Sequence, residues 1–112
     1  MARETLSKEM LFVEDVTNLD AVTSATDGIA VDTRWYKDKT IFITVSGNSG
    51  AVTVNIEASH DGTDWFGVAT KTYAASTNTV DIYSYTSYFP YMRTTTTTQG
   101  TSTVSTVITG RS

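Results

Sequence analysis

The feature that most constrains the fold of this chain is an alternation of apolar and polar residues with a period of two. TIFITVS, residues 40–46, places two isoleucines and a valine on one face and Phe42 on the other. AVTVNIEAS, residues 51–59, and STVSTVIT, residues 102–109, alternate in the same way. Such a pattern is typical of antiparallel strands with one solvated face.

Turn residues separate the alternating segments, as in SGNSGA, HDGTD and TQGTS, which predict hairpin connections. Threonine is abundant, and β-branched residues favour strands over helices. We predict strands near 10–16, 29–36, 40–46, 51–59, 64–70, 78–85, 90–98 and 102–109. The predicted fold is all-β: an antiparallel β-sandwich, Ig-like or jelly-roll-like, of about 7–8 strands with an extended N-terminal arm.

The length of 112 residues allows one domain. We assign residues 29–112 to a single β-sandwich domain and residues 1–28 to an N-terminal arm or first strand. The first segment holds six acids and two bases around one apolar cluster, MLFV. A first strand with a loop and an arm on a neighbouring molecule are both open, and we favour the arm. Its predicted contact residues are Met10, Leu11, Phe12, Val13 and Glu14.

The charge distribution narrows the choice of partners. The net charge is −4, and beyond Asp81 the only charged residues are Arg93 and Arg111. Nucleic-acid binding needs a basic surface, so we expect no nucleic-acid partner. The apolar run 10–13 is too short for a signal peptide or a membrane span, so we expect a cytoplasmic product that has no membrane partner.

No pattern in the sequence predicts catalysis or a metal site. His60, Asp61 and Asp64 lie on one short turn, where side-chain capping by Asp64 or Thr63 is a better explanation than metal binding. No cysteine, second histidine or G-x-S-x-G elbow is present. We therefore expect no enzymatic activity, no metal and no cofactor.

Aromatic residues provide the candidate contact sites. Trp65 and Phe66 point to opposite faces of a strand, so at least one ring should enter the core. The tyrosine-rich segment 81–93 fits a sandwich corner first, a protein interface second and a carbohydrate platform third. The candidate interface or core residues are Trp35, Trp65, Phe66, Tyr83, Tyr85, Tyr88, Tyr91 and Arg93.

The segment 93–106 is rich in threonine and has almost no charge. Edge strands are usually protected by lysine, proline or bulges. The two strands in this segment should therefore be interior to a sheet, or one should be covered by a neighbouring subunit. The second alternative is a hypothesis of self-assembly.

Three segments, IEASHDGTDWFGVA, YFPYMRTTTT and GTSTVSTVITGRS, together resemble small β-sandwich proteins encoded among the virion genes of tailed bacteriophages. The resemblance covers residues 40–112. It implies a structural role in the virion, most economically a head decoration (cement) protein that binds and stabilises the major capsid protein shell. Such proteins use a terminal arm and often form homo-oligomers, with a trimer favoured. A tail, neck or fibre component remains an alternative, as does a carbohydrate-binding module.

Overall fold

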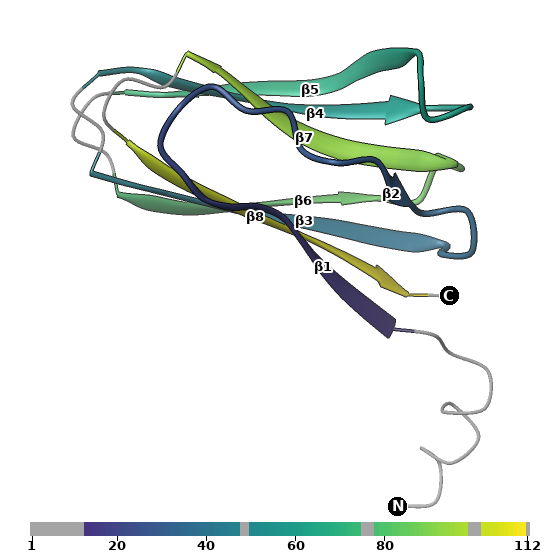
Figure 1. Cartoon of the computed structure of the whole chain (residues 1–112). Helices are drawn as coiled ribbons and strands as arrows, with labels where there is room; N and C mark the ends of the chain where they lie inside the picture. Colours follow the sequence, from purple (N-terminus) through teal and green to yellow (C-terminus); the bar gives the residue numbers. More distant parts are fainter. Residues whose placement is uncertain (1–12, 48–49, 75–77, 99–101, 112) are drawn as a thin grey trace, which may run out of the picture.

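The computed structural model describes residues 13–47, 50–74, 78–98 and 102–111 of the chain. These residues form two stacked sheets of four antiparallel strands (Figure 1). The strands are β1 Val13–Val22, β2 Val31–Asp32, β3 Asp38–Ser46, β4 Val52–Ser59, β5 Trp65–Tyr73, β6 Thr79–Tyr85, β7 Tyr91–Thr98 and β8 Thr103–Arg111. The first sheet has the order β1-β8-β3-β6 and the second β2-β7-β4-β5. The predicted all-β sandwich is confirmed, and no membrane-spanning helix occurs in these ranges.

The core fills the space between the two sheets, and the alternation seen in the sequence decides which residues enter it. Every second residue of β3, β4 and β8 is buried, whereas Phe42 on the opposite face of β3 is 37% exposed. The core is completed by Leu19, Val31, Tyr73 and Met92. The period of two therefore identified the inward side of these strands correctly.

Both threonine-rich strands lie inside a sheet. β7 runs between β2 and β4, and β8 runs between β1 and β3. Thr94, Thr95 and Thr96 are buried. The first of the two alternatives for this segment is thus the one observed, and these strands no longer support the hypothesis of self-assembly.

The first strand differs from its prediction. β1 begins at Val13 and continues to Val22, beyond the predicted 10–16, and it pairs with β8. Two register shifts, on either side of Leu19, interrupt the ladder, and the Leu19 side chain is only 1% exposed. Residues 13–28 are therefore a first strand with a loop that belongs to the sandwich. Residues 1–12 lie outside the described residues.

β2 is also much shorter than the predicted strand 29–36. The Asp32 carboxylate accepts hydrogen bonds from the backbone N–H and the Nε of Arg34, at 3.1 and 3.0 Å. A side-chain bond of this kind closes a local turn. The Thr33 N–H still donates to the Pro90 carbonyl at 2.9 Å before the chain turns away from β7. The chain then runs through a loop to β3 in which Thr33 is buried and Arg34, Trp35 and Lys37 are exposed.

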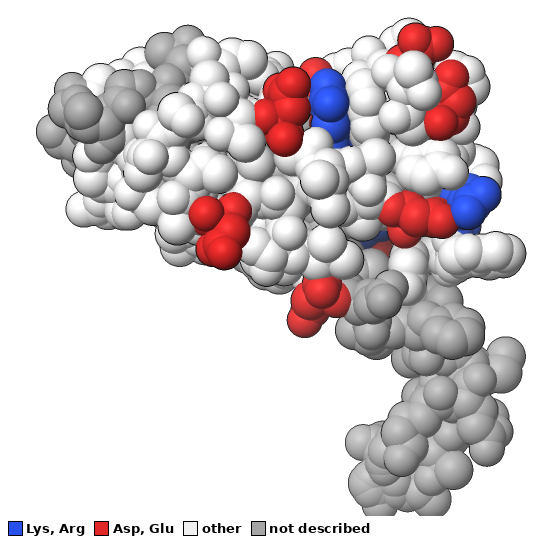
Figure 2. Space-filling model, viewed as in Figure 1, with Lys and Arg blue, Asp and Glu red and all other residues white. Residues whose placement is uncertain are grey.

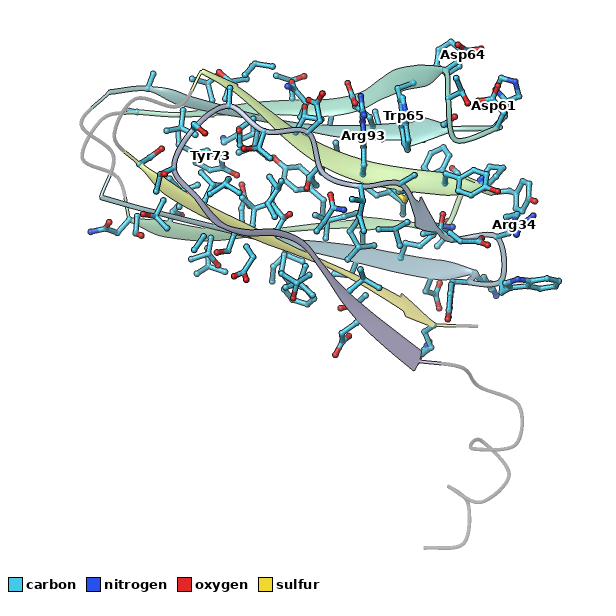
Figure 3. The ribbon with its side chains drawn as sticks, in the orientation of Figure 1. Arg34, Asp61, Asp64, Trp65, Tyr73 and Arg93 are labelled. Atoms are coloured by element: carbon cyan, nitrogen blue, oxygen red, sulfur yellow. The ribbon has the colours of Figure 1, made fainter. Side chains whose placement is uncertain are left out.

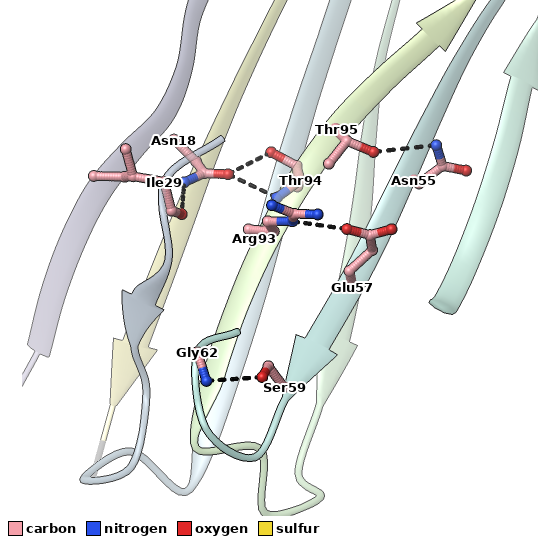
Figure 4. A network of polar contacts seen from close by, with 9 residues as sticks. All are labelled: Asn18, Ile29, Asn55, Glu57, Ser59, Gly62, Arg93, Thr94 and Thr95. Carbon is pink, nitrogen blue, oxygen red and sulfur yellow. Dashed lines mark hydrogen bonds and ion pairs between the residues drawn. The ribbon is translucent and has the colours of Figure 1, made fainter. Parts of the chain in front are cut away.

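A chain of polar contacts ties β1 to both sheets (Figure 4). Asn18 Oδ1 accepts hydrogen bonds from the backbone N–H and the hydroxyl of Thr94, both at 2.7 Å, and Asn18 Nδ2 donates to the Ile29 carbonyl at 2.9 Å. The Thr94 hydroxyl lies 2.6 Å from that of Thr106, which accepts from the Leu19 N–H at 3.0 Å. Because Thr94 donates to Asn18, Thr106 must donate to Thr94.

Candidate functional site

The β4–β5 turn is held together by its own polar groups. Asp61 Oδ1 accepts hydrogen bonds from the N–H groups of Thr63 and Asp64, at 2.8 and 2.9 Å. The Ser59 hydroxyl donates to the same oxygen at 3.0 Å and accepts from the Gly62 N–H at 2.8 Å. The capping side chains are therefore Asp61 and Ser59, and the prediction of Asp64 or Thr63 was wrong. The N–H donors hold the pKa of Asp61 at about 2.

The same turn places a serine, a histidine and an aspartate close together, yet their hydrogen bonds do not match a catalytic triad. The Ser59 hydroxyl donates to Asp61 Oδ1, and His60 Nε2 lies 3.7 Å from Asp61 Oδ2. A nucleophilic serine would have to donate to the histidine. Ser59 is instead engaged in fixing the turn.

Trp65 lies on the outer face of the second sheet beside Arg93 (Figure 3). The Arg93 guanidinium carbon is 4.4 Å from the centroid of the indole ring, and Arg93 Nε donates to Glu57 Oε1 at 2.7 Å. Trp65 is half-buried and Phe66 is 61% exposed, so the prediction that one of these rings enters the core was wrong. Val68 and Ala69 pack against the core instead.

The predicted aromatic residues separate into two groups. Tyr83 and Tyr85 are partly buried and pack against the core, and burial raises the pKa of both phenols. Trp35, Phe66 and Tyr88 are exposed by 74%, 61% and 69%. The exposed rings therefore remain available for contact with another molecule.

The exposed rings share one end of the sandwich, which we call the aromatic end and define by loops 33–37, 60–64 and 86–90 with the adjoining Phe66. Figure 1 shows these three connections together at the right-hand end of the two sheets. Tyr91 completes the group, because the Arg34 guanidinium carbon lies 5.5 Å from the centroid of its ring.

Two shallow grooves open at the aromatic end, and Tyr88 lines both. The first, of about 420 Å³, is lined mainly by apolar groups, including Phe66, Val68 and Pro90. The second, of about 350 Å³, is lined by Trp35 together with basic side chains of its loop. The first groove, with its aromatic rings and few polar groups, fits contact with an apolar surface, whereas the second adds basic side chains to its rings.

Lys39 fixes two of these loops and was not among the predicted site residues. Its side chain is 1% exposed, and Nζ donates to the carbonyls of Tyr36, Lys37 and Ser87 at 3.2, 3.4 and 2.5 Å. Burial lowers the pKa of this amine. The burial of Lys39 could have been predicted from the sequence, because Lys39 stands two residues before Ile41 and so falls on the inward side of the alternating strand.

The predicted arm residues are only partly covered by the structure. Met10, Leu11 and Phe12 lie outside the described residues. The backbones of Val13 and Glu14 belong to β1, opposite Arg111 and Gly110 of β8. Their positions are thus those of a strand within the sandwich.

Charged side chains form no continuous basic patch on the face drawn in Figure 2, where acidic groups are spread and the prominent basic groups lie beside acidic ones. The ion pairs Arg34–Asp32 and Arg93–Glu57, at 2.6 and 2.7 Å, account for two basic groups. This pairing removes cations that a phosphate backbone would otherwise attract.

No protein-family model and no curated protein sequence matches this chain. Solved structures do share its fold. The SPBc2 prophage-derived protein YomS is 14% identical with a TM-score of 0.56, covering 89% of this chain and 95% of YomS. The PBSX exported protein XepA is 17% identical with a TM-score of 0.57, covering 89% of this chain and 36% of XepA. A protein of the Bacillus endospore appendages, described as disulfide-linked pili, is 17% identical with a TM-score of 0.51, covering 90% and 82%.

These likenesses define a class of fold, a small antiparallel β-sandwich that occurs in phage-derived proteins and in surface appendages. At such low identity they carry no residue roles and no partners over to this chain.

Proposed function

We propose that this chain is a structural protein of a bacteriophage particle that acts by binding other proteins. The observation that carries the proposal is the aromatic end, where Trp35, Phe66 and Tyr88 are exposed around two grooves. Exposed aromatic rings are typical anchors of protein interfaces. The fold shared with prophage-derived proteins agrees with a place in the virion.

The more specific form of the proposal is a capsid decoration protein bound to the major capsid protein. Repeated shallow contacts gain strength by avidity when a symmetric shell presents many equivalent sites. We propose that the segment ahead of β1 adds the second contact, as a strand or an extended arm on the shell. A homo-oligomer of any order would multiply both contacts.

The first experiment asks whether the chain is part of the particle. Phage particles from the host that carries the gene are purified, and the copy number of the protein per particle is measured by quantitative mass spectrometry. A decoration protein should be present in many copies that follow capsid symmetry. Its absence from purified particles would contradict the virion proposal, and a copy number of a few per particle would favour the tail or neck.

The second experiment tests the aromatic end. The substitutions Phe66→Ser and Tyr88→Ser should each lower occupancy on the particle by at least about tenfold, the effect of losing an interface anchor. Ile29→Ser is the matched control, because Ile29 is 69% exposed and lines neither groove. Equal loss with all three variants would show that the aromatic end has no special role.

A carbohydrate-binding role is the second candidate, and the second groove favours it. Trp35 and Tyr88 offer ring faces, while Arg34 and Lys37 offer hydrogen-bond donors on the same groove. Sugars stack on aromatic faces and need nearby polar groups to fix their orientation. Binding on a glycan array that disappears with Trp35→Ala would support this role, and an array without binding would remove it.

A further inference from the structure

The two sheets end in β1, β6, β2 and β5, and three of these edges are protected. β1 carries two register shifts together with Asp15 and Asp20, and β5 carries one shift and Lys71. β2 is only two residues long. Bulges, charges and shortness are the usual devices that prevent an edge from pairing with another chain.

β6 lacks most of these devices. It pairs with β3 from Thr79 to Tyr85 without a register shift, and it contains neither lysine nor proline. Its outward side chains Val80 and Ile82 are 66% and 57% exposed. The one charge in the strand is Asp81, which points inward and accepts the Tyr73 hydroxyl at 3.0 Å.

One hydrogen bond identifies the backbone groups that face the open edge of β6. The Ile82 N–H donates to Asp81 Oδ1 at 3.1 Å, which places this donor on the side away from β3. In an antiparallel ladder the N–H and C=O of one residue point to the same side, and alternate residues point oppositely. The N–H and C=O groups of Val80, Ile82 and Ser84 therefore line the free edge.

We propose that a second copy of this chain pairs with this edge, antiparallel, about a two-fold axis that passes beside Ile82. The two first sheets then become one continuous sheet. In this register Val80 lies opposite Ser84 of the second copy, Ile82 lies opposite Ile82, and the whole length of β6 is used. On pairing, the Ile82 N–H gives up its hydrogen bond to Asp81 Oδ1 and donates instead to the Ile82 carbonyl of the other copy.

Charge disfavours the neighbouring register centred on Asp81, and a register centred on Tyr83 would leave Thr79 and Val80 without partners in β6. A two-fold axis beside Asp81 would bring two carboxylates together at a Cα separation of about 4.5 Å, and like charges in directly opposite positions are destabilising. With the axis at Ile82, each Asp81 faces Tyr83 of the other copy, whose hydroxyl is a donor. In the register centred on Ile82, β6 is thus complementary to itself over its whole length.

The outer face of the first sheet supports the same arrangement. Phe42 of β3 lies between Val107 of β8 and Ile82 of β6 in one row across the strands. Pairing at Ile82 joins the rows of the two copies into one apolar stripe. The outward positions of β6 from Val80 to Ser84 carry no charge, so the net charge of −4 on each copy is not concentrated at the contact.

Single cysteines test the register directly, because the natural chain has none. Residues in a hydrogen-bonded antiparallel pair have Cα atoms about 5.5 Å apart, within the range that a disulfide spans. Ile82→Cys should form a disulfide-linked dimer under mild oxidation. Val80→Cys alone should not, since the two copies of residue 80 lie about 13 Å apart along the strands. A mixture of Val80→Cys and Ser84→Cys should cross-link.

Mass in solution, measured by sedimentation up to about 100 µM so that micromolar contacts are populated, completes the test. The natural chain should show a dimer, Ile82→Lys a folded monomer by circular dichroism, and Thr44→Lys a dimer. Thr44 is the matched control because it faces outward on β3, beside Val80 but away from the edge.

A natural chain that stays monomeric, or a trimer in which Ile82→Cys fails to cross-link, would overturn the proposal. Loss of the dimer in Thr44→Lys without a cross-link at residue 82 would also overturn it, because the sheet faces would then be the contact. None of these outcomes depends on whether the chain is found in phage particles.

Discussion

At the scale of single residues, Gly28 occupies the most restricted position near the polar contacts of β1. A Cβ at this position would lie 2.7 Å from the Thr94 carbonyl oxygen and would overlap the Asn18 side chain. Neither neighbour can move freely, since the Gly28 N–H donates to the Thr94 carbonyl at 2.8 Å and Asn18 is bonded on both sides of its amide.

We predict that Gly28→Ala lowers the free energy of unfolding by about 3 kcal/mol, the upper part of the range for overpacking. Urea denaturation measures the loss. Gly67→Ala is the control, because a Cβ at Gly67 meets nothing within 4 Å, and its free energy of unfolding should change by less than about 1 kcal/mol. Equal losses in the two variants would mean that the contact around Gly28 is not what limits substitution.

Asp61 makes the stability of the folded protein depend on pH in the acid range. Its pKa is about 2 in the folded protein, below the ordinary value of 3.8, because the N–H groups of Asp64 and Thr63 bond the ionised carboxylate. A depressed folded-state pKa adds stability that is complete above the unfolded pKa and is lost as pH falls through the folded pKa.

We predict that Asp61→Ala destabilises the protein at pH 6 and that its difference from the natural chain shrinks as pH falls from about 4 to about 2. Thermal unfolding of both proteins across this range measures the difference. Asp64→Ala is the control, since its carboxylate takes no part in the capping bonds of the turn. A difference that stays constant with pH would show that the charge of Asp61 is not responsible.

At the scale of elements, the strands that could be predicted from the sequence are those with an unbroken alternation. β3, β4 and β8 were located within two residues at each end, and their inward sides were identified correctly. β1 was not, because the register shifts around Leu19 break the period of two, and the apolar cluster MLFV drew the predicted strand toward the N-terminus. The strand predicted at 29–36 was too long, because the pattern of apolar residues does not reveal the turn that the Asp32 carboxylate closes.

The candidate site was predictable as a list of residues but not as an arrangement. Tyrosine-rich segments and isolated tryptophans indicate contact surfaces, yet exposure depends on where each strand ends. Phe66 is opposite Ala58 on an inward position, but it lies at the open end of the sandwich, where it lines a groove rather than the core. Only the pairing of strands distant in the sequence reveals this.

The hydrogen-bonded hydroxyls of Thr94 and Thr106 connect a strand of each sheet, and they can be tested as a pair. Thr106→Val keeps the volume but leaves the Leu19 N–H without its acceptor, so we predict a loss of about 1–3 kcal/mol. The double variant with Thr94→Val should lose less than the sum of the single losses, by at least about 0.5 kcal/mol, because both remove one shared bond.

Denaturant unfolding of the natural chain, the two single variants and the double variant gives the four free energies of this double-mutant cycle. Thr72→Val is the control: the Thr72 hydroxyl also lies 3.1 Å from another threonine, Thr53, but this pair is on the exposed outer face. Its loss should stay within about 0.5 kcal/mol. If the free-energy losses of Thr94→Val and Thr106→Val simply add in the double variant, the hydrogen bond between the two hydroxyls does not stabilise the contact between the sheets.

At the scale of the whole molecule, the two sheets are linked differently along their two sides. On one side the Tyr73 hydroxyl of β5 donates to Asp81 of β6, and burial together with this bond raises the pKa of the phenol. On the other side Asn18 of β1 bonds Thr94 of β7, and β1 inserts Leu19 into the core. β1 is therefore part of what closes the sandwich, whereas an arm for a partner must lie ahead of Val13.

Two truncations separate these roles. Removing residues 1–12 should leave the free energy of unfolding within about 0.5 kcal/mol of the natural value, because all strands from β1 to β8 are retained. Removing residues 1–22 deletes β1 and uncovers β8, and should leave a chain without a cooperative unfolding transition. Leu19→Ala in the full chain is the intermediate control, with an expected loss of about 2–5 kcal/mol.

Thermal and urea unfolding of the three proteins measures these outcomes, and particle binding is then measured only for the shorter truncation. If the chain without residues 1–12 is folded but no longer occupies phage particles, the loss belongs to the arm rather than to instability. A folded chain without residues 1–22 would contradict the role of β1, since Leu19 and the contacts of Asn18 would then be dispensable for closing the two sheets.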